Sequence, residues 1–215
     1  MKYNEESAQK VAEFLLQINA VKLNAAEPFT WASGLKSPIY CDNRITLSFP
    51  KIRDFIREEF TKVIRNAFEI PDVLAGVATG GIAQGALVAQ EFDKPFVYIR
   101  SSQKAHGLEN KIEGVVEKGQ KVVVIEDLVS TGKSSLHAVN ALISAGCEVI
   151  GMVAIFSYNL EIALENFEKA GVKLYTLSDY ESLIRKALEI KYISDADHDS
   201  LVEWRKNPKK WAENF

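Results

Sequence analysis

A short β-branched run that ends in two acids and a small-residue loop constrains the fold more than any other part of this 215-residue chain. Val122–Ile125 has the pattern of a buried strand in a parallel sheet. Glu126 and Asp127 close this run, and Ser130-Thr131-Gly132 then leads into helix-forming residues. Such a loop brings free backbone N–H groups and the helix dipole together, so it predicts an anion site. The adjacent acids favour a ligand that carries hydroxyls or a bound cation beside its phosphate.

Two other interpretations of this loop stay open. A nucleoside-triphosphate P-loop requires G-x-x-x-x-G-K-[ST], and its end fits Gly132-Lys133-Ser134. Its first glycine would fall on Asp127, whose carboxylate would repel a polyphosphate. A plain turn capped by Ser130 or Thr131 explains the hydroxyls and the glycine. It leaves unexplained two acids at the carboxyl end of a strand, where α/β proteins bind ligands.

Strand-like and helical segments alternate through most of the chain, which predicts an α/β fold with a central parallel sheet flanked by helices. The predicted strands are 73–78, 96–99, 122–125, 149–155 and 172–176, and the predicted helices between them are 80–90, 134–144 and 161–170. Two earlier helices are expected at 5–18, with Ser7 as a candidate cap, and at 52–68. We expect the first of them and the aromatic segment near 20–45 to form a small hood over the carboxyl edge of the sheet. The tail from Ser194, with Trp204 and Trp211, is interpreted as a surface helix and an end piece.

Bulk composition predicts one globular domain in a reducing compartment. Hydrophobic residues make up 47% of the chain, and the net charge of −3 argues against a nucleic-acid surface. The two cysteines, Cys41 and Cys147, form no C-x-x-C pair, which disfavours a disulfide framework or a zinc site. The start MKYNEES has no apolar signal core, and no apolar run reaches the length of a membrane span. These features predict a cytoplasmic protein with no membrane partner.

Three segments together resemble the orotate phosphoribosyltransferases, a branch of the type I phosphoribosyltransferase family. Glu126–Ser134, E-D-L-V-S-T-G-K-S, is similar to the motif that binds phosphoribosyl pyrophosphate (PRPP). Phe29–Gly34, followed by Ser37–Arg44, resembles the family's N-terminal signature, and Arg100–Gly107 resembles its mobile catalytic loop. The resemblance implies a single domain over 1–215, with a PRPP-binding core at about 70–180. It also implies transfer of the phosphoribosyl group from PRPP to orotate, which gives orotidine 5′-monophosphate and pyrophosphate in pyrimidine synthesis.

The resemblance assigns the PRPP contacts and the metal. Carboxylates at 126 and 127 would accept the ribose hydroxyls and favour the positive charge that develops on the sugar. Mg²⁺ would bind mainly to PRPP phosphates, with Asp127 contributing through water. Lys133 either adds charge at the phosphate or faces solvent. Thr79-Gly80-Gly81 is similar to the pyrophosphate loop, although a lone glycine pair also serves as a packing or turn feature. The residues expected to bind PRPP are Thr79, Gly80, Arg100, Lys104, His106, Glu126, Asp127, Leu128, Val129, Ser130, Thr131, Gly132, Lys133 and Ser134.

The polar segment that begins at Arg100 is the expected lid. Arg100, Lys104 and His106 would act with Asp127 in catalysis, because cations closing over pyrophosphate neutralise the leaving charge and exclude water. On composition alone the segment is equally consistent with a solvated charged loop. The family usually has a lysine where this chain has Ser101, which leaves more of the role to Lys104. In the family this loop serves the neighbouring subunit's site, so a homodimer is implied. His106 could act as a general base or donate a hydrogen bond to pyrophosphate.

The hood segment is the expected orotate site. Orotate is a flat anion that needs a stacking wall and donors for its carboxylate. Tyr40, Arg44 and Ser130 are the candidates, although Arg44 could instead form an ion pair with Asp42. Many relatives have a lysine at the position of Ala32 and an arginine near Phe156-Ser157-Tyr158, and this chain has neither. Lys22 or Lys36 could compensate.

Two rival functions remain open. The first keeps PRPP and changes the base to a purine such as xanthine. The second is a ligand-sensing regulator without turnover, which should carry a basic nucleic-acid patch. The acidic charge balance argues against such a patch.

Overall fold

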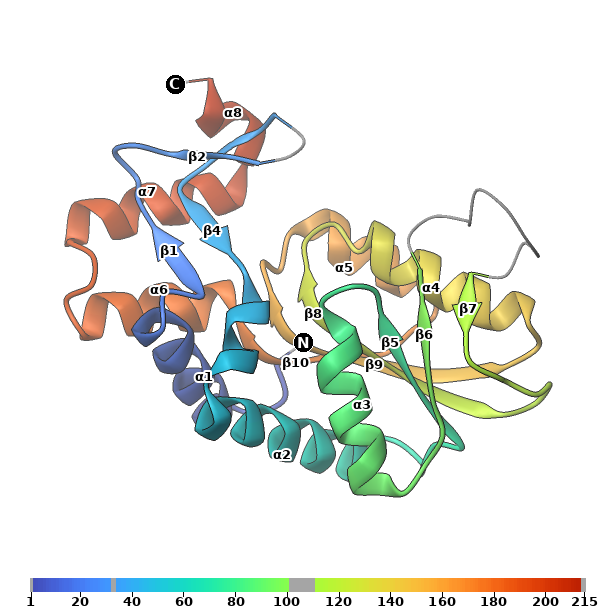
Figure 1. The fold of residues 1–215 in the computed structure, drawn as a ribbon. Coiled ribbons are helices and arrows are strands. Elements are labelled where there is room, and N and C mark those ends of the chain that lie inside the picture. Colours follow the sequence, from blue (N-terminus) through green and yellow to red (C-terminus); the bar gives the residue numbers. More distant parts are fainter. Residues whose placement is uncertain (1, 32–33, 101–110, 214–215) are drawn as a thin grey trace.

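The centre of the molecule is a six-stranded sheet, seen in a computed structural model that describes residues 2–31, 34–100 and 111–213 (Figure 1). The strand order is β10-β9-β8-β5-β6-β7. The four pairings from β10 to β6 are parallel, whereas β7 pairs with β6 in the antiparallel direction. The predicted parallel sheet is therefore confirmed, with one antiparallel edge strand added. The strands are β5 (Val73–Val77), β6 (Phe96–Ile99), β7 (Ile112–Glu113), β8 (Lys121–Val129), β9 (Glu148–Ser157) and β10 (Leu174–Asp179).

Helices cover both faces of this sheet, because its central strands are apolar on both sides. Val123 and Ile125 pack into one buried cluster, while Val122 and Val124 pack into the other. The first cluster includes residues of α1 (Glu5–Gln17), α2 (Pro50–Ala67), α3 (Gly81–Phe92) and α6 (Tyr180–Glu189). The second includes residues of α4 (Lys133–Ser144) and α5 (Glu161–Lys169).

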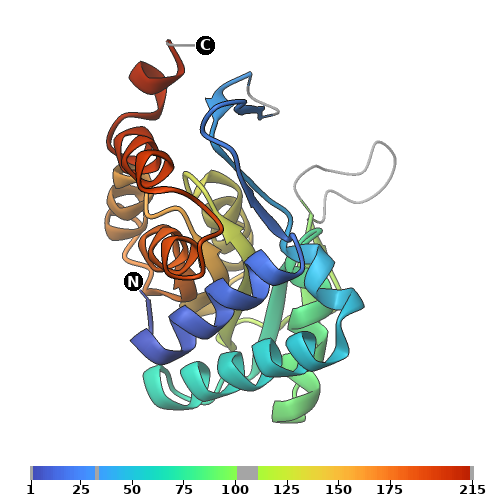
Figure 2. The same cartoon turned by 90° about the vertical axis from the view of Figure 1, so that its left-hand side faces the viewer.

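The hood consists of two short antiparallel pairs that rise from one end of the sheet (Figures 1 and 2). β1 (Val21–Leu23) pairs with β4 (Ile39–Cys41), and β2 (Phe29–Thr30) pairs with β3 (Lys36–Ser37). A 3₁₀ helix, η1 (Asn43–Ser48), leads back from the hood to α2. The last helices, α7 (Asp195–Lys206) and α8 (Pro208–Ala212), contact this hood, α8 through β3 and α7 through Trp204.

The structure corrects two predictions about the N-terminal helix. The helix is not part of the hood, because α1 packs against α6, β10 and α2 beside the sheet (Figure 2). Ser7 is not its cap: the Asn4 side chain accepts the Ser7 N–H at 2.8 Å. Ser7 instead lies in the first turn, and its hydroxyl donates to the buried Glu59 carboxylate.

One further prediction, the end of the strand at Ile125, is wrong because the strand pairs with residues distant in the sequence. The strand predicted to stop at Ile125 continues to Val129, because Leu128 and Val129 pair with residues of β9. The tail from Ser194 forms the predicted surface helix, α7, and an end piece, α8, whose buried residues are Leu201, Trp204 and Trp211. Among the described residues, no helix is long and apolar enough to cross a bilayer.

Candidate active site

Two loops meet at the carboxyl edge of the sheet, where β5 and β8 lie side by side. The loop after β5 contains Thr79 and Gly80, and the end of β8 carries Glu126 and Asp127. A Cβ atom added at Gly80 would lie 2.1 Å from the Asp127 carboxyl carbon. Only glycine at position 80 therefore leaves room for that carboxylate, and the structure brings the two predicted segments together.

Both helices that follow these loops begin without a side-chain cap. Gly80 is the N-cap of α3, and Gly132 is the N-cap of α4 with a φ of 78°. The alternative of a turn capped by Ser130 or Thr131 is therefore wrong. The free backbone N–H groups and the positive dipole ends of both helices therefore lie at the same edge of the sheet. Each helix N-terminus can bind one anionic group.

Glu126 is a buried carboxyl group on the α4 side of β8. It is 4% exposed, and its two oxygens accept hydrogen bonds from the Ser135 hydroxyl at 2.8 Å and from the Asp127 N–H at 3.1 Å. Burial, followed by the charge of Asp127, raises the pKa of Glu126 well above its ordinary value. The group is thus fixed in orientation and would gain from a nearby positive charge.

Asp127 faces the opposite side of β8, toward the hood. Burial raises the pKa of Asp127 as well. Its backbone carbonyl accepts a hydrogen bond from the Asn43 side-chain N–H at 2.6 Å, which ties the base of the hood to the acid pair. Asn43 belongs to the predicted hood signature, but contact with a residue 84 positions away is not visible in a sequence.

The turn between β8 and α4 holds the other residues of the predicted phosphate motif. Leu128 and Val129 are the last residues of β8, while Ser130 and Thr131 are half-buried. The Thr131 carbonyl accepts a hydrogen bond from the Asn166 side chain at 3.0 Å, which holds the turn against α5. Lys133 and Ser134 are exposed at the start of α4, so of the two positions left open for Lys133 the structure shows the solvent-facing one.

The predicted base-binding residues lie on the hood. The Tyr40 ring is 43% exposed and its centre lies 5.8 Å from that of Phe29. Arg44 donates two hydrogen bonds to Asp42, at 2.7 and 2.8 Å, and lowers the pKa of that carboxyl group. Of the two roles left open for Arg44, the structure shows the ion pair.

Arg100 is the only residue of the predicted catalytic set 100, 104 and 106 that falls in the described part of the chain. The Arg100 guanidinium lies 3.3 Å from the Glu113 carboxylate. The backbone N–H of Arg100 donates a hydrogen bond to the Lys111 carbonyl at 2.9 Å. Lys104 and His106 lie outside the described residues. His137, on α4, lies with its Nε2 3.1 Å from the Lys111 Nζ.

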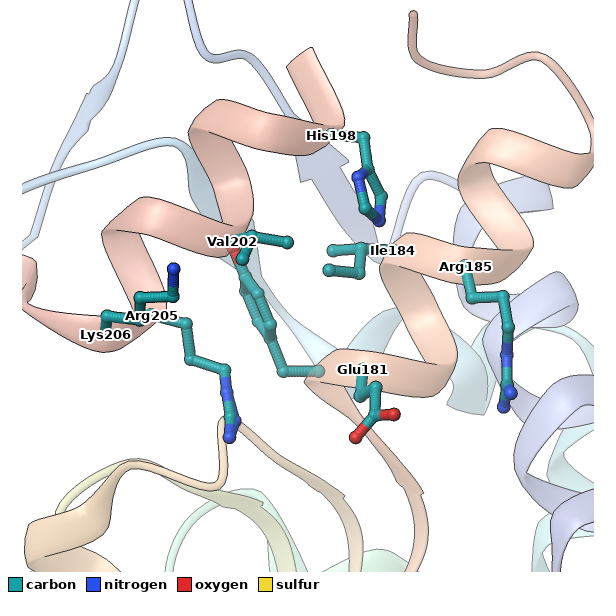
Figure 3. A pocket seen from close by; sticks show the side chains of 8 residues that line it. Glu181, Ile184, Arg185, His198, Val202, Arg205 and Lys206 are labelled. Atoms are coloured by element: carbon teal, nitrogen blue, oxygen red, sulfur yellow. The ribbon is translucent and has the colours of Figure 1, made fainter. Parts of the chain in front are cut away.

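A separate pocket of about 440 Å³ lies between α6 and α7 (Figure 3). Its apolar part includes Ile184 and Val202, and Arg185, Arg205 and Lys206 surround it. Two of these cations already have acidic partners, since Arg185 pairs with Glu5 and Lys206 with Glu203. No residue of the predicted site lines this pocket.

Comparison with known proteins identifies the family. A model of the phosphoribosyl transferase domain matches residues 47–180. An orotate phosphoribosyltransferase of Phocaeicola vulgatus is 56% identical over 200 residues, which cover 93% of this chain and 94% of the relative. The chain belongs to the orotate phosphoribosyltransferase family.

Other members of the orotate phosphoribosyltransferase family agree in sequence and in fold. An orotate phosphoribosyltransferase from Listeria monocytogenes is 54% identical over 204 residues, with 95% of this chain and 98% of the relative covered. The crystal structure of orotate phosphoribosyltransferase from Aeropyrum pernix superimposes with a TM-score of 0.74 at 26% identity, covering 86% of this chain and 99% of that one. The predicted fold, a type I phosphoribosyltransferase fold with an N-terminal hood, is confirmed.

Proposed function

We propose that this chain transfers the 5-phosphoribosyl group from PRPP to orotate, giving orotidine 5′-monophosphate and pyrophosphate. The observation that carries the proposal is the position of Glu126 and Asp127 between two uncapped helix N-termini. One N-terminus, at Gly132, suits the 5′-phosphate, and the other, at Gly80, suits the pyrophosphate. The acids between them suit the ribose. This division accounts for every polar group of PRPP at one edge of the sheet.

The reaction in this site is a displacement at the anomeric carbon of the ribose. The bond from this carbon to pyrophosphate breaks, with the bonding electrons leaving on pyrophosphate, and positive charge develops on the sugar ring. The bond to orotate N1 forms as N1 gives up its proton to His106 or to the departing pyrophosphate. Burial makes the charged form of both Glu126 and Asp127 unfavourable in the free protein, as their raised pKa values indicate. A positive sugar beside them relieves that cost, so the pair stabilises the transition state more than the ground state.

Mg²⁺ fits this site as an ion held mainly by the substrate. Among the described residues, no three His, Cys, Asp or Glu side chains gather into a metal cluster. Glu126 already accepts two hydrogen bonds, which leaves the Asp127 carboxylate as the protein group for water-mediated contact. When bound, the ion would neutralise charge on the pyrophosphate.

The base and lid contacts complete the proposal. Tyr40 and Ser130 would line the orotate site, and Arg44 would reach the orotate carboxylate only by leaving Asp42. Arg100, Lys104 and His106 would close over pyrophosphate, with the loop contributed by the partner subunit of a homodimer.

A single domain over residues 1–215 in the cytoplasm is also part of the proposal. Both cysteines are free thiols, which is consistent with a reducing compartment.

Ultraviolet-monitored consumption of orotate with PRPP and Mg²⁺ tests the function. We expect turnover of orotate and none of xanthine under the same conditions. A Lys104→Ala variant should lose most of the rate with its fold intact. Turnover of xanthine in place of orotate would assign the base site to purines, and binding of PRPP without turnover of either base would favour a regulator. Unchanged turnover by Lys104→Ala would remove the lid from the mechanism.

A further inference from the structure

Helix α5 contacts the turn between β8 and α4, although no residue of α5 belongs to a predicted motif. The Asn166 side-chain amide donates a hydrogen bond to the Thr131 carbonyl at 3.0 Å. The Phe167 ring covers the next residue of the turn, since a Cβ atom added at Gly132 would lie 2.9 Å from the Phe167 Cε2 atom. Two consecutive residues of α5 therefore contact the two ends of one peptide unit, the one that joins Thr131 to Gly132.

The backbone of Gly132 leaves two orientations open to this peptide unit. Gly132 has a φ of 78° and a ψ of 0°, which are the values of the third residue in a type II turn. A type I turn reverses the peptide unit before that residue, whose φ is then about −90°. Glycine adopts either value of φ, because it has no Cβ atom. The choice between the two orientations therefore depends on contacts outside the turn.

Only one of the two orientations suits an anion. In a planar trans peptide unit the carbonyl and the N–H point in opposite directions. Asn166 holds the Thr131 carbonyl on the side of α5, so the Gly132 N–H points away from α5. Among the hydrogen bonds of the described residues, this N–H has no acceptor. In the reversed orientation the negative end of the carbonyl dipole would take the place of the N–H and repel a phosphate.

We propose that Asn166 is a positioning residue that selects the anion-binding orientation of the peptide unit between Thr131 and Gly132. Asn166 thereby strengthens the binding of the 5′-phosphate of PRPP without touching it. This inference rests on the proposed function, which assigns the helix N-terminus at Gly132 to that phosphate. If loss of the Asn166 amide leaves the binding orientation populated at about a third to a tenth, the affinity falls about threefold to tenfold. One hydrogen bond of ordinary strength supports a change of this size.

The test is calorimetric titration of Asn166→Ala with ribose 5-phosphate and, separately, with pyrophosphate. We expect the Kd for ribose 5-phosphate and the KM for PRPP to rise about threefold to tenfold. The Kd for pyrophosphate and the KM for orotate should stay close to wild type, because neither ligand uses the Gly132 N–H. Alanine favours helix, so α5 and the thermal midpoint should be preserved. Asn166→Gln keeps an amide donor and should recover affinity for ribose 5-phosphate.

Asn66→Ala is the matched control. It removes a side-chain amide from α2, where that group donates to the Tyr3 hydroxyl at 2.7 Å, and it should leave every ligand affinity unchanged. Wild-type affinity for ribose 5-phosphate in Asn166→Ala, or an equal loss of affinity for pyrophosphate, would overturn the inference. A wild-type protein that fails to consume orotate would instead contradict the proposed function.

Discussion

Glu126 lies in an environment unlike that of an ordinary, solvated carboxyl group. It is buried, accepts a hydrogen bond from Ser135 and adjoins a second acid. A group with these surroundings lowers the stability of the free protein whenever it is ionised. Its presence at the end of β8 is therefore better explained by ligand binding than by folding.

Replacing Glu126 by Gln should stabilise the free protein, and more so at high pH. The folded-state pKa of Glu126 is raised above the unfolded value, so folding takes up a proton and stability falls as pH rises above the unfolded pKa of about 4.3. Gln has no charge to bury and retains an acceptor for the Ser135 hydroxyl. We expect the gain in thermal midpoint over wild type to be larger at pH 8 than at pH 5, measured by differential scanning fluorimetry.

Glu117→Gln, at an exposed position, controls for the loss of one negative charge and should shift the midpoint little at either pH. A Glu126→Gln variant that is less stable than wild type at pH 8 would contradict the account of the buried charge. Turnover by Glu126→Gln should fall even as its stability increases, because the carboxylate acts on the sugar.

Residue-level predictions from the sequence were possible where the chemistry is local. Glu126 and Asp127 were recognised because two acids beside a small-residue loop are unusual in a phosphate site. The contact of Asn43 with the acid pair was missed, since Asp127 is far from Asn43 in the sequence. Arg44 could not be assigned, because an ion pair and a ligand contact use the same side chain.

At the scale of elements, the site depends on how closely the β5–α3 loop approaches the end of β8. Gly81 shows the same constraint as Gly80, because a Cβ atom there would lie 2.3 Å from the Ile125 carbonyl oxygen. The helix α3 can begin beside β8 only because neither residue has a side chain. The two helix N-termini are thereby brought to the same edge of the sheet.

Gly80→Ala should reduce kcat/KM by about a hundredfold, because the added methyl group displaces the Asp127 carboxylate and small misplacements of reacting groups are costly. Gly80 has a φ of −66°, which alanine adopts without strain, so the backbone should be preserved. Steady-state kinetics and far-ultraviolet circular dichroism measure the two effects. Ala86→Ser, at an exposed position of the same helix, should leave activity unchanged. Wild-type activity in Gly80→Ala would show that Asp127 is not held in place by this contact.

Elements were predictable from apolar periodicity wherever burial is regular. The strand 96–99 was predicted with its observed bounds, and the predicted helices at 80–90, 134–144 and 161–170 end within two residues of the observed ones. The end of β8 was misplaced because charged residues interrupt the apolar pattern, while pairing with β9 continues past them. The place of α1 beside the sheet depends on its packing against α6, which local periodicity does not specify.

At the scale of the whole molecule, the C-terminal helices connect the hood to the sheet. Trp204 of α7 contacts both Trp31 of the hood and Tyr158 of β9. The tail forms the surface helix that was expected, but nothing in its own sequence indicates these aromatic partners. The hood, the sheet and the tail therefore share one aromatic cluster, and the site is a property of the entire chain.

The proposed sharing of the loop between subunits predicts complementation between two inactive variants. Lys104→Ala removes the lid cation, and Asp127→Asn removes the carboxylate that acts on the sugar. A mixed dimer would contain one site with both wild-type groups, so remixed subunits should recover about a quarter of wild-type activity. Turnover after denaturation and joint refolding measures this recovery. Absence of recovery, in samples shown by light scattering to be dimeric, would contradict loop sharing.

The most direct test of the central claim is a crystal structure with orotidine 5′-monophosphate bound. We predict the 5′-phosphate on the N–H groups of the turn from Ser130 to Ser134, the ribose hydroxyls on Glu126 and Asp127, and the base toward the hood. A nucleotide bound elsewhere, with the acid pair untouched, would contradict the account.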